Sequence, residues 1–358
     1  MIHTSAVIEG RQVTIGYREG KRETDLFTDM DFTLYRGELT TLLGTNGTGK
    51  STLLRTMSAT QPYLRGNILL NGRELSSYNE RELARHIGVV FTERYMAGGL
   101  RVHELVALGR YPYTGFFGRL DENDRLITEA VMEQVGIYHK RDSYLSQLSD
   151  GERQKAFIAK ALAQESDVIL LDEPTAFLDL PSRIETMSLL HRLAEENGKT
   201  ILMSTHDVEQ ALVLADRLWL LSPGNGLECG ATEDMILAGR LDRLFPSDNI
   251  RFDTEHGSYY PLVHSHTPIA LSAADPTLLH WGINLLNRNG FSCLIDENVS
   301  VSTENRHTHK NGEIPHISIN AVNCISLSHN GTTYTLPSFS ALADTIRSMK
   351  PKLTNSRQ

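Results

Sequence analysis

The sequence is short of cysteine, of long hydrophobic runs and of surplus positive charge. Its three cysteines, Cys229, Cys293 and Cys324, are isolated and lack metal-ligand spacing, which favours buried thiols in a reducing compartment over a disulfide framework. No run approaches the ~18 apolar residues of a membrane span, and the first residues lack the pattern of a signal peptide. We therefore expect a cytoplasmic protein, which a partner must bring to any membrane where it works.

Acidic residues outnumber basic ones by 44 to 35, which gives a formal net charge of −9. A protein with this balance has no basic field to attract nucleic acid, so a nucleic-acid partner is disfavoured. The length of 358 residues is enough for two domains, each with its own core.

Residues 44–52 carry the strongest chemical signal in the chain. They read GTNGTGKST, which has the glycines, lysine and hydroxyl of a nucleoside-triphosphate loop. The glycines allow a tight turn whose N–H groups face phosphate oxygens, Lys50 would neutralise the β- and γ-phosphates, and Ser51 would bind Mg²⁺. The expected nucleotide-binding residues of the loop are Gly44, Thr45, Asn46, Gly47, Thr48, Gly49, Lys50, Ser51 and Thr52.

The flanks of this loop have the pattern that the motif requires. Residues 38–43 are predicted to form a buried strand, and residues 52–57 to open a helix. Before them, residues 30–35 alternate like a strand, and Arg36-Gly37 predicts a hairpin turn into the strand that leads to the loop. The loop alone does not separate a kinase, a GTPase and a transport ATPase.

The next part of the chain changes from strands to helices. A strand over 66–70, the turn Asn71-Gly72, a helix over 80–87 and a strand over 88–91 are followed by helical patterns. The clearest of these helices cover 102–109 and 129–135. We expect a helical insertion over about 92–164.

Two further segments carry polar groups at the ends of predicted elements. Residues 148–154, LSDGERQ, open a helix whose free N–H groups would suit an anion, although an ordinary N-cap is the commoner use of such a serine. Residues 168–174 form a buried strand that ends in Asp172 and Glu173. Asp172 would reach Mg²⁺, and Glu173 would orient or deprotonate the attacking water. His206 ends another strand, where a histidine is either structural or a partner of the γ-phosphate.

With these motifs in their order, residues 5–245 resemble the ATP-binding subunit of an ABC transporter. The resemblance implies a P-loop ABC ATPase cassette of α/β class, with a RecA-like core, an antiparallel β subdomain and the helical insert. Residues 105–112, LVALGRYP, and the segment 148–154 resemble the subunits that power import of iron-siderophores, haem or cobalamin. ATP and Mg²⁺ are the implied ligands.

The resemblance also implies an assembly. Two copies would enclose two ATP molecules as a homodimer, each site receiving the signature residues of the other copy. The dimer would sit at the inner face of the membrane on integral permease subunits, with a periplasmic or surface substrate-binding protein as an indirect partner. The resemblance implies that Tyr17 stacks on the adenine, although a tyrosine packed at the end of a strand is the alternative interpretation. It implies catalytic roles for Glu173 and His206 and the D-loop role for Asp179. The signature residues, which would act on the nucleotide bound by the other copy, are Ser149, Asp150, Gly151 and Glu152.

Three residues depart from the family pattern. Thr92 stands where a glutamine is usual, so its role near Mg²⁺ and the membrane partner is open. Asp150 and Glu152 stand where glycine and glutamine are commoner, and they put carboxylates near a helix end that should bind phosphate.

The last third, residues 246–358, carries no motif with a chemical reading. Strands over 317–319 and 325–327, a hairpin turn at Asn330-Gly331, and helices over 278–286 and 339–347 predict a small α+β accessory domain. It would stabilise the dimer or sense the imported substrate. Three histidines, His307, His309 and His316, are expected to be solvated loop residues rather than a metal site.

Three functions therefore compete. The first is the ATPase subunit of a membrane importer, the second is an exporter subunit, and the third is a soluble ABC ATPase of repair or translation. The single phosphate loop and the short insert without heptads speak against the third. The residues do not fix the direction of transport.

Overall fold

The computed structural model describes residues 5–91, 99–115, 118–245, 249–254, 256–261, 263, 268–295, 308–309 and 312–355. The chain divides into two compact units, a first unit of Met1–Pro246 with Thr254–Ser258, and a second unit of Ser247–Asp253 with Tyr259–Gln358. Among the described residues, no helix combines the length and apolarity that crossing a membrane requires.

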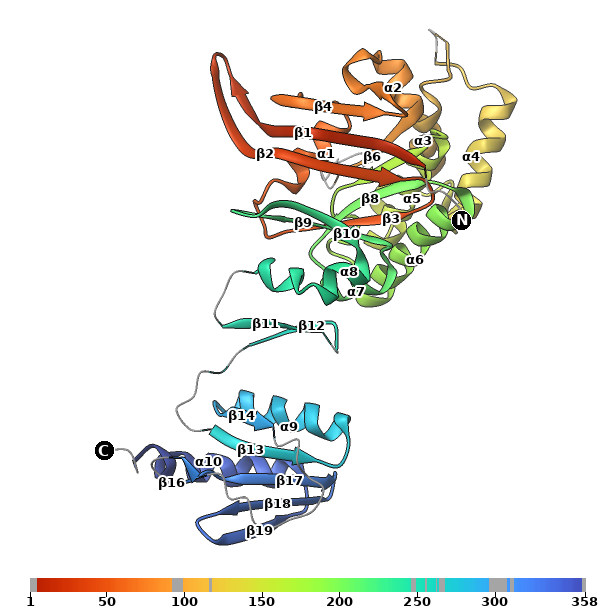
Figure 1. The fold of residues 1–358 in the computed structure, drawn as a ribbon. Coiled ribbons are helices and arrows are strands. Elements are labelled where there is room, and N and C mark those ends of the chain that lie inside the picture. Colours follow the sequence, from red (N-terminus) through yellow and green to blue (C-terminus); the bar gives the residue numbers. More distant parts are fainter. Residues whose placement is uncertain are drawn as a thin grey trace. The chain divides into compact units, whose positions relative to one another are not determined.

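The first unit contains two sheets and most of the helices (Figure 1). Its strands are β1 (Ala6–Glu19), β2 (Arg22–Tyr35), β3 (Leu39–Leu43), β4 (Arg65–Leu70), β5 (Arg73–Glu74), β6 (Ile87–Val90), β7 (Val168–Leu171), β8 (Thr200–Thr205), β9 (Arg217–Ser222) and β10 (Gly226–Ala231). Its helices are α1 (Lys50–Met57), α2 (Glu80–His86), α3 (Val102–Ala107), α4 (Glu122–Gln134), α5 (Asp150–Ala163), α6 (Leu180–Asn197), α7 (Val208–Leu214) and α8 (Thr232–Leu237). Short 3₁₀ turns are η1 (Leu75–Ser77), η2 (Leu108–Arg110), η3 (Tyr138–Lys140), η4 (Leu145–Gln147) and η5 (Arg240–Arg243).

The larger sheet has the strand order β10-β9-β3-β8-β7-β6. Its strands run parallel from β9 to β6, and β10 joins the edge antiparallel to β9. Since parallel strands end at the same edge, the segments that follow β3, β7 and β8 come together there. The smaller sheet is antiparallel, with the order β2-β1-β4-β5.

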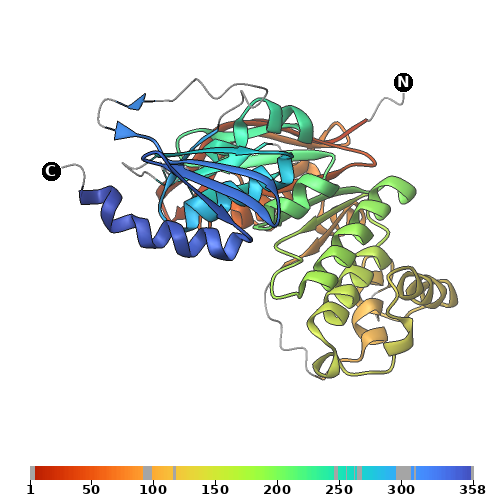
Figure 2. The same ribbon diagram turned by 90° about the horizontal axis from the view of Figure 1, so that it is seen from below.

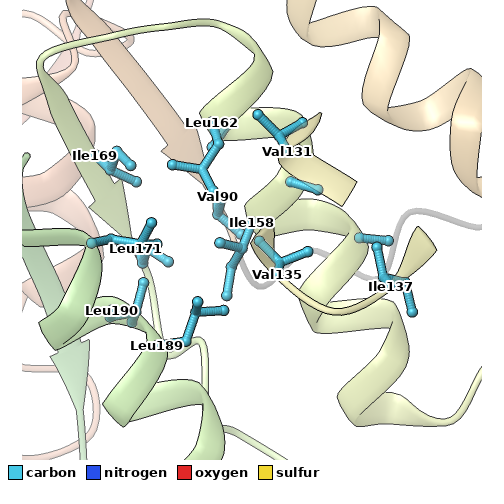
Figure 3. Packing of buried hydrophobic residues seen from close by; sticks show 14 of the residues in the cluster. Val90, Val131, Val135, Ile137, Ile158, Leu162, Ile169, Leu171, Leu189 and Leu190 are labelled. Atoms are coloured by element: carbon cyan, nitrogen blue, oxygen red, sulfur yellow. The ribbon is translucent and has the colours of Figure 1, made fainter. Parts of the chain in front are cut away.

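The strands of the larger sheet are buried on both faces, which explains their continuous apolar sequences. In β7, Val168 and Leu170 belong to a core cluster that includes Trp219 and side chains of the antiparallel sheet. Ile169 and Leu171 point the other way and pack against α5 and α6 (Figure 3). Each such fully buried side chain stabilises the fold by roughly 1.5–3 kcal/mol.

The helical insertion is present in the structure as α3, α4 and α5, which pack on one another through the same apolar cluster. Figure 2 shows these helices gathered at one end of the first unit. Side-chain N-caps begin several helices of the chain, because a side-chain oxygen there accepts a free backbone N–H. The capping residues include Asn79, Asp121, Ser149, Asp179 and Asp207.

The predicted hairpin between residues 30–35 and 38–43 is wrong. β2 pairs with β1, through a turn at Gly20 and Lys21, whereas β3 enters the middle of the other sheet between β9 and β8. The reason is burial: all five residues of β3 are buried, so the strand needs neighbours and covering elements on both sides. Arg36-Gly37 is therefore a connection between two sheets.

The second unit has its own core. Its elements are β11 (Ile250–Asp253), β12 (Ser258–Pro261), β13 (Pro268–Ala273), α9 (Pro276–Arg288), β14 (Ser292–Ile295), β15 (Thr308–His309), β16 (Gly312–Glu313), β17 (His316–Ala321), β18 (Cys324–His329), β19 (Thr332–Leu336) and α10 (Phe339–Asn355). A five-stranded sheet of order β14-β13-β17-β18-β19 carries α9 and α10 on one face, where Leu271, Ile317 and Leu327 are buried (Figure 1). The predicted α+β character is confirmed.

The turn at Asn330 and Gly331 is confirmed as a hairpin that joins β18 to β19, and both residues have positive φ, as a two-residue primed turn requires. The expectation of buried thiols is wrong for Cys229 and Cys324, which are exposed. Cys229 lies on the edge strand β10, where only one side is covered by a neighbouring strand.

Candidate nucleotide site

The phosphate loop lies between β3 and α1, at the edge where the parallel strands end. Gly49 is the N-cap of α1 with φ of 111°, and Gly47 has φ of 74°, values that side chains rarely allow. The N–H of Thr48 donates to the carbonyl of Thr45 at 3.2 Å, which curls the loop around the start of the helix. The free N–H groups of α1 thus face a concave segment suited to an anion.

Lys50 is buried and holds the loop together from inside. Its Nζ donates to the carbonyl oxygens of Gly44 at 2.9 Å and Thr45 at 3.2 Å. Burial lowers the pKa of the Lys50 amine, because it disfavours the charged form, and the nearby carboxylates of Glu173 and Asp172 partly offset this. The ammonium is therefore placed where phosphate oxygens would find a positive charge.

Asp172 and Glu173 follow β7 and are held by one hydroxyl. The Oγ of Ser204, on β8, donates to Asp172 Oδ1 at 2.7 Å and accepts the Glu173 N–H at 2.9 Å. Glu173 has φ of 48°, an unusual value for a residue other than glycine, so this hydrogen bond supports a strained backbone. Ser204 belongs to no motif, and its position two residues before His206 is the signal in the sequence that points to it.

His206 follows β8 and meets both other charged groups. Its Nε2 lies 2.5 Å from Glu173 Oε1 and 3.5 Å from Lys50 Nζ, and Glu173 Oε1 lies 3.9 Å from Lys50 Nζ. A cavity of about 290 Å³ adjoins this group, and its lining includes Gly44, Thr45, Asn46 and His206. Three side chains from three segments thus converge beside the phosphate loop.

Tyr17 lies at the end of β1 that is near α1. Its hydroxyl is 3.1 Å from the Thr52 Oγ1, and half of the residue remains exposed. The ring is therefore tied at its polar tip to the first turn of the helix while its body stays accessible. Both readings of Tyr17 agree with this position, but the exposed ring offers a flat ligand a surface to stack on.

Ser149 begins α5 as part of a capping box. Its Oγ accepts the Glu152 N–H at 3.2 Å, and the Glu152 carboxylate accepts the Ser149 N–H at 3.0 Å. This N–H, together with Lys140 at 3.2 Å, holds the pKa of Glu152 below its usual range. Asp150 is paired with Arg153 at 2.9 Å. Both unusual carboxylates therefore have cationic partners, which reduces the repulsion they would exert on a phosphate.

The start of α5 lies against the start of α6. A Cβ added at Gly151 would lie 3.0 Å from Ser182 Oγ, so a larger residue would require Ser182 to shift by a few tenths of an ångström. Asp179 caps α6 by accepting the Ser182 N–H at 3.0 Å. The structure thus places Gly151 and Asp179 at neighbouring helix starts, while their expected contacts with a second copy stay predictions.

The remaining expectations concern Thr92 and three histidines. Thr92 and His307 lie outside the described residues, and so does the side chain of His309. The expectation of a loop position is wrong for His316, which lies on strand β17 with its Nε2 3.3 Å from the Ser272 Oγ. The absence of a metal site at these histidines stays a prediction.

The sequence of this chain is similar to one known family and to several known proteins. The family profile described as ABC transporter matches residues 27–176. The iron(3+)-hydroxamate import ATP-binding protein FhuC of Bacillus subtilis is 36% identical over 237 residues, which cover 66% of this chain and 87% of that protein. The ferric enterobactin transport ATP-binding protein FepC of Escherichia coli is 36% identical over 245 residues, covering 68% and 89%.

Solved structures agree with these relatives. A structure described as an inward-facing conformation of a metal-chelate type ABC transporter matches with a TM-score of 0.60 at 26% identity, covering 73% of this chain and 99% of that chain. A bacterial ABC transporter cassette described as dimeric matches with a TM-score of 0.55 at 26% identity, covering 63% and 98%. The expected cassette fold of the first unit is confirmed.

Proposed function

Because this chain belongs to the family of ABC transporter ATP-binding proteins, we propose that it hydrolyses ATP to drive a membrane importer of iron-siderophores, with haem and cobalamin as alternative cargoes. Two observations support the proposal. Two relatives whose names refer to import or transport of ferric chelates match this chain over 87% and 89% of their own length, and the candidate residues that follow three strand ends lie together beside the phosphate loop. ATP binding itself follows from family membership.

The side chains divide the work of hydrolysis. Lys50 and the N–H groups of α1 would bind the β- and γ-phosphates. Glu173 would take the proton of the attacking water, and His206, 2.5 Å from that carboxylate, would hold it in place and contact the γ-phosphate. Tyr17 would stack on the adenine.

A divalent metal ion fits the residues at this edge. The Ser51 hydroxyl and the Asp172 carboxylate supply oxygens, the ligand class that Mg²⁺ prefers, and Ser204 fixes the orientation of Asp172. Bound there, Mg²⁺ would neutralise developing charge on the phosphate oxygens. Thr92 is a further candidate near the metal.

Catalysis would require two copies. Ser149, Asp150, Gly151 and Glu152 would meet the nucleotide of the partner subunit, and Asp179 would lie at the same junction. The dimeric cassette that matches this fold supports the arrangement. We further propose that the dimer binds permease subunits on the cytoplasmic face of the membrane, indirectly served by a substrate-binding protein. Residues 1–245 would form the ATPase domain, and residues 246–358, which follow it in the chain, an accessory domain.

The test is ATP-dependent dimerisation followed by transport. The Glu173→Gln variant, which should bind ATP without hydrolysing it, is expected to dimerise at millimolar Mg-ATP, while Lys50→Ala stays monomeric under the same conditions. Light scattering coupled to size-exclusion chromatography reports the masses. A monomeric Glu173→Gln variant would refute the two-copy site. Uptake of a labelled ferric siderophore is then measured in cells that carry either variant. Loss of uptake would identify the cargo, and unchanged uptake would exclude it.

A further inference from the structure

The loop that carries His206 is anchored by the residue that follows it. Asp207 Oδ1 accepts the Gln210 N–H at 3.2 Å, which caps α7, and its Oδ2 accepts a hydrogen bond from Arg183 Nη1 at 2.8 Å. The Asp207 N–H donates to Thr205 Oγ1 at 3.0 Å. Asp207 thus fixes the backbone beside His206, and one of its carboxylate oxygens depends on a residue from another element.

Arg183 belongs to the first turn of α6. Besides Asp207, its Nη2 donates to the carbonyl of Leu178 at 3.2 Å, the residue before the cap Asp179. Its Nε is buried and has no hydrogen-bond partner within the described part of the chain, which costs stability. The guanidinium therefore joins the start of α6 to the His206 loop through two hydrogen bonds.

The same turn of α6 touches the start of α5. Gly151 lies against Ser182, with 3.0 Å between an added Cβ and the Ser182 Oγ, and one turn further on Lys155 pairs with Glu185 at 2.9 Å. These contacts tie the two helix starts together. A displacement of the start of α5 would therefore act on the first turn of α6, which carries Arg183.

We propose that Arg183 is a positioning residue that couples the start of α5 to the placement of His206. This rests on the proposed function: the nucleotide of the partner subunit would act on Ser149 and Gly151, α6 would follow, and the Arg183–Asp207 pair would set His206 against Glu173 and the γ-phosphate of the chain's own nucleotide. Displacing a catalytic group by about 1 Å can lower the reaction rate by up to ~100-fold. A single ion pair that positions His206 is therefore enough to make hydrolysis at one site depend on the nucleotide at the other.

A matched ion pair provides the control. Arg217 and Glu38 are 2.7 Å apart with side chains 30% and 17% exposed, against 2.8 Å, 34% and 17% for Arg183 and Asp207. Arg217 begins β9 and Glu38 precedes β3, so this pair lies at the edge of the sheet opposite the phosphate loop. Pairs with this exposure contribute similarly and modestly to stability.

The experiment compares full-length Arg183→Gln, Asp207→Asn, the double variant and Arg217→Gln. Asparagine at 207 retains the helix cap, so this change removes mainly the charge. We expect Arg183→Gln to lower kcat about tenfold with the KM for Mg-ATP within about twofold, because binding is intact and positioning is lost. The double variant should be no slower than the slower single variant, since both changes remove one interaction. Arg183→Lys should recover part of the rate.

Every outcome of this comparison either supports or overturns the inference. Arg217→Gln should melt at the same temperature as Arg183→Gln but keep the wild-type kcat. Equal kcat for these two variants, or single effects that multiply in the double variant, would overturn the inference. If Arg183→Gln fails to fold, Asp207→Asn and Arg183→Lys give the same comparison. A wild-type protein that turns over no ATP would refute the proposed function, whereas turnover that Arg183→Gln leaves unchanged refutes only the coupling.

Discussion

Two clusters of charged residues in the first unit differ in the hydrogen bonds that their buried cation makes. Arg110, 3% exposed, donates to Asp124 at 2.8 Å, to Glu165 at 2.6 Å and to the carbonyl of Ala163 at 2.7 Å, and the Tyr113 ring lies 4.2 Å from its guanidinium carbon. This cluster links η2 to α4 and to the end of α5. Because several N–H groups of Arg110 are held by these partners, we interpret the cluster as a structural scaffold that stabilises the fold.

The second cluster consists of Lys50, Glu173 and His206. Lys50 is 5% exposed, whereas the side chains of Glu173 and His206 are 29% and 40% exposed, and His206 lines the cavity. Lys50 holds carbonyl oxygens of its own loop, which phosphate oxygens can replace. Both clusters bury a cation, but Arg110 donates to two carboxylates at 2.8 Å and 2.6 Å, whereas Lys50 donates to two carbonyl oxygens of its own loop and lies 3.9 Å from Glu173 Oε1.

The largest expected effect separates the two clusters by activity. Glu173→Gln should lower kcat at least ~100-fold, because the amide cannot take a proton from water, with ATP affinity and melting temperature near those of the wild type. Steady-state ATPase assays and nucleotide titration measure this. An active Glu173→Gln enzyme would assign the base to another residue.

The opposite result is expected at the scaffold. Arg110→Met should reduce the free energy of unfolding by about 3–5 kcal/mol, since it leaves the Asp124 carboxylate buried without its cation. Urea unfolding measures the loss. Arg11→Gln, at the exposed pair with Glu9, is the control and should stay within about 0.5 kcal/mol of the wild type. Equal stability of Arg110→Met and Arg11→Gln would show that the cluster is not a scaffold.

A residue at the edge of the site should affect both properties. Ser204→Ala removes the hydroxyl shared by Asp172 and the Glu173 N–H, so we expect a loss of about 1–3 kcal/mol together with a fall in kcat of about tenfold. Thr128→Val on α4 removes another buried hydroxyl, which donates to the carbonyl of Asp124 at 2.7 Å. It should reduce stability to a similar extent and leave kcat unchanged; a parallel fall in kcat would make the Ser204 effect unspecific.

The smallest expected effect is a change with pH. Burial works to raise the pKa of Asp124, but hydrogen bonds from Arg110 and from the Asp121 N–H outweigh it and lower the pKa. A carboxylate with a lowered folded-state pKa stabilises the fold above its unfolded value of about 3.9, and this stabilisation is lost as the pH falls through the folded value. The stability difference between the wild type and Asp124→Asn should therefore narrow below about pH 4 in urea unfolding, and a constant difference would contradict this origin.

The sequence predicted the helices and strands better than it predicted which strands pair with one another. The strands around the phosphate loop, the helical insertion and the Asn330-Gly331 turn follow from local patterns that each element carries alone. The sheet that β3 joins does not follow from its own residues, because the turn at Gly37 is compatible with a hairpin and with a crossing between sheets. Only the burial of all five β3 residues distinguishes the two.

The candidate site shows the same division. Lys50, Asp172, Glu173 and His206 belong to motifs, so their types and spacing identified them. Ser204, Arg183 and Arg110 act through contacts with residues 31, 24 and 14 positions away. Apart from the place of Ser204 two residues before His206, nothing near them in the sequence indicates these contacts. A solvated arginine and a buried one look alike until the fold brings their partners together.

The separate apolar core of the second unit has a calorimetric consequence. Leu271, Ile317 and Leu327 are buried against α9 and α10 rather than among the side chains of the ATPase unit, so heating is expected to produce two melting transitions instead of one. Mg-ATP should raise the temperature of only one of them, because a ligand stabilises the cooperative unit that binds it.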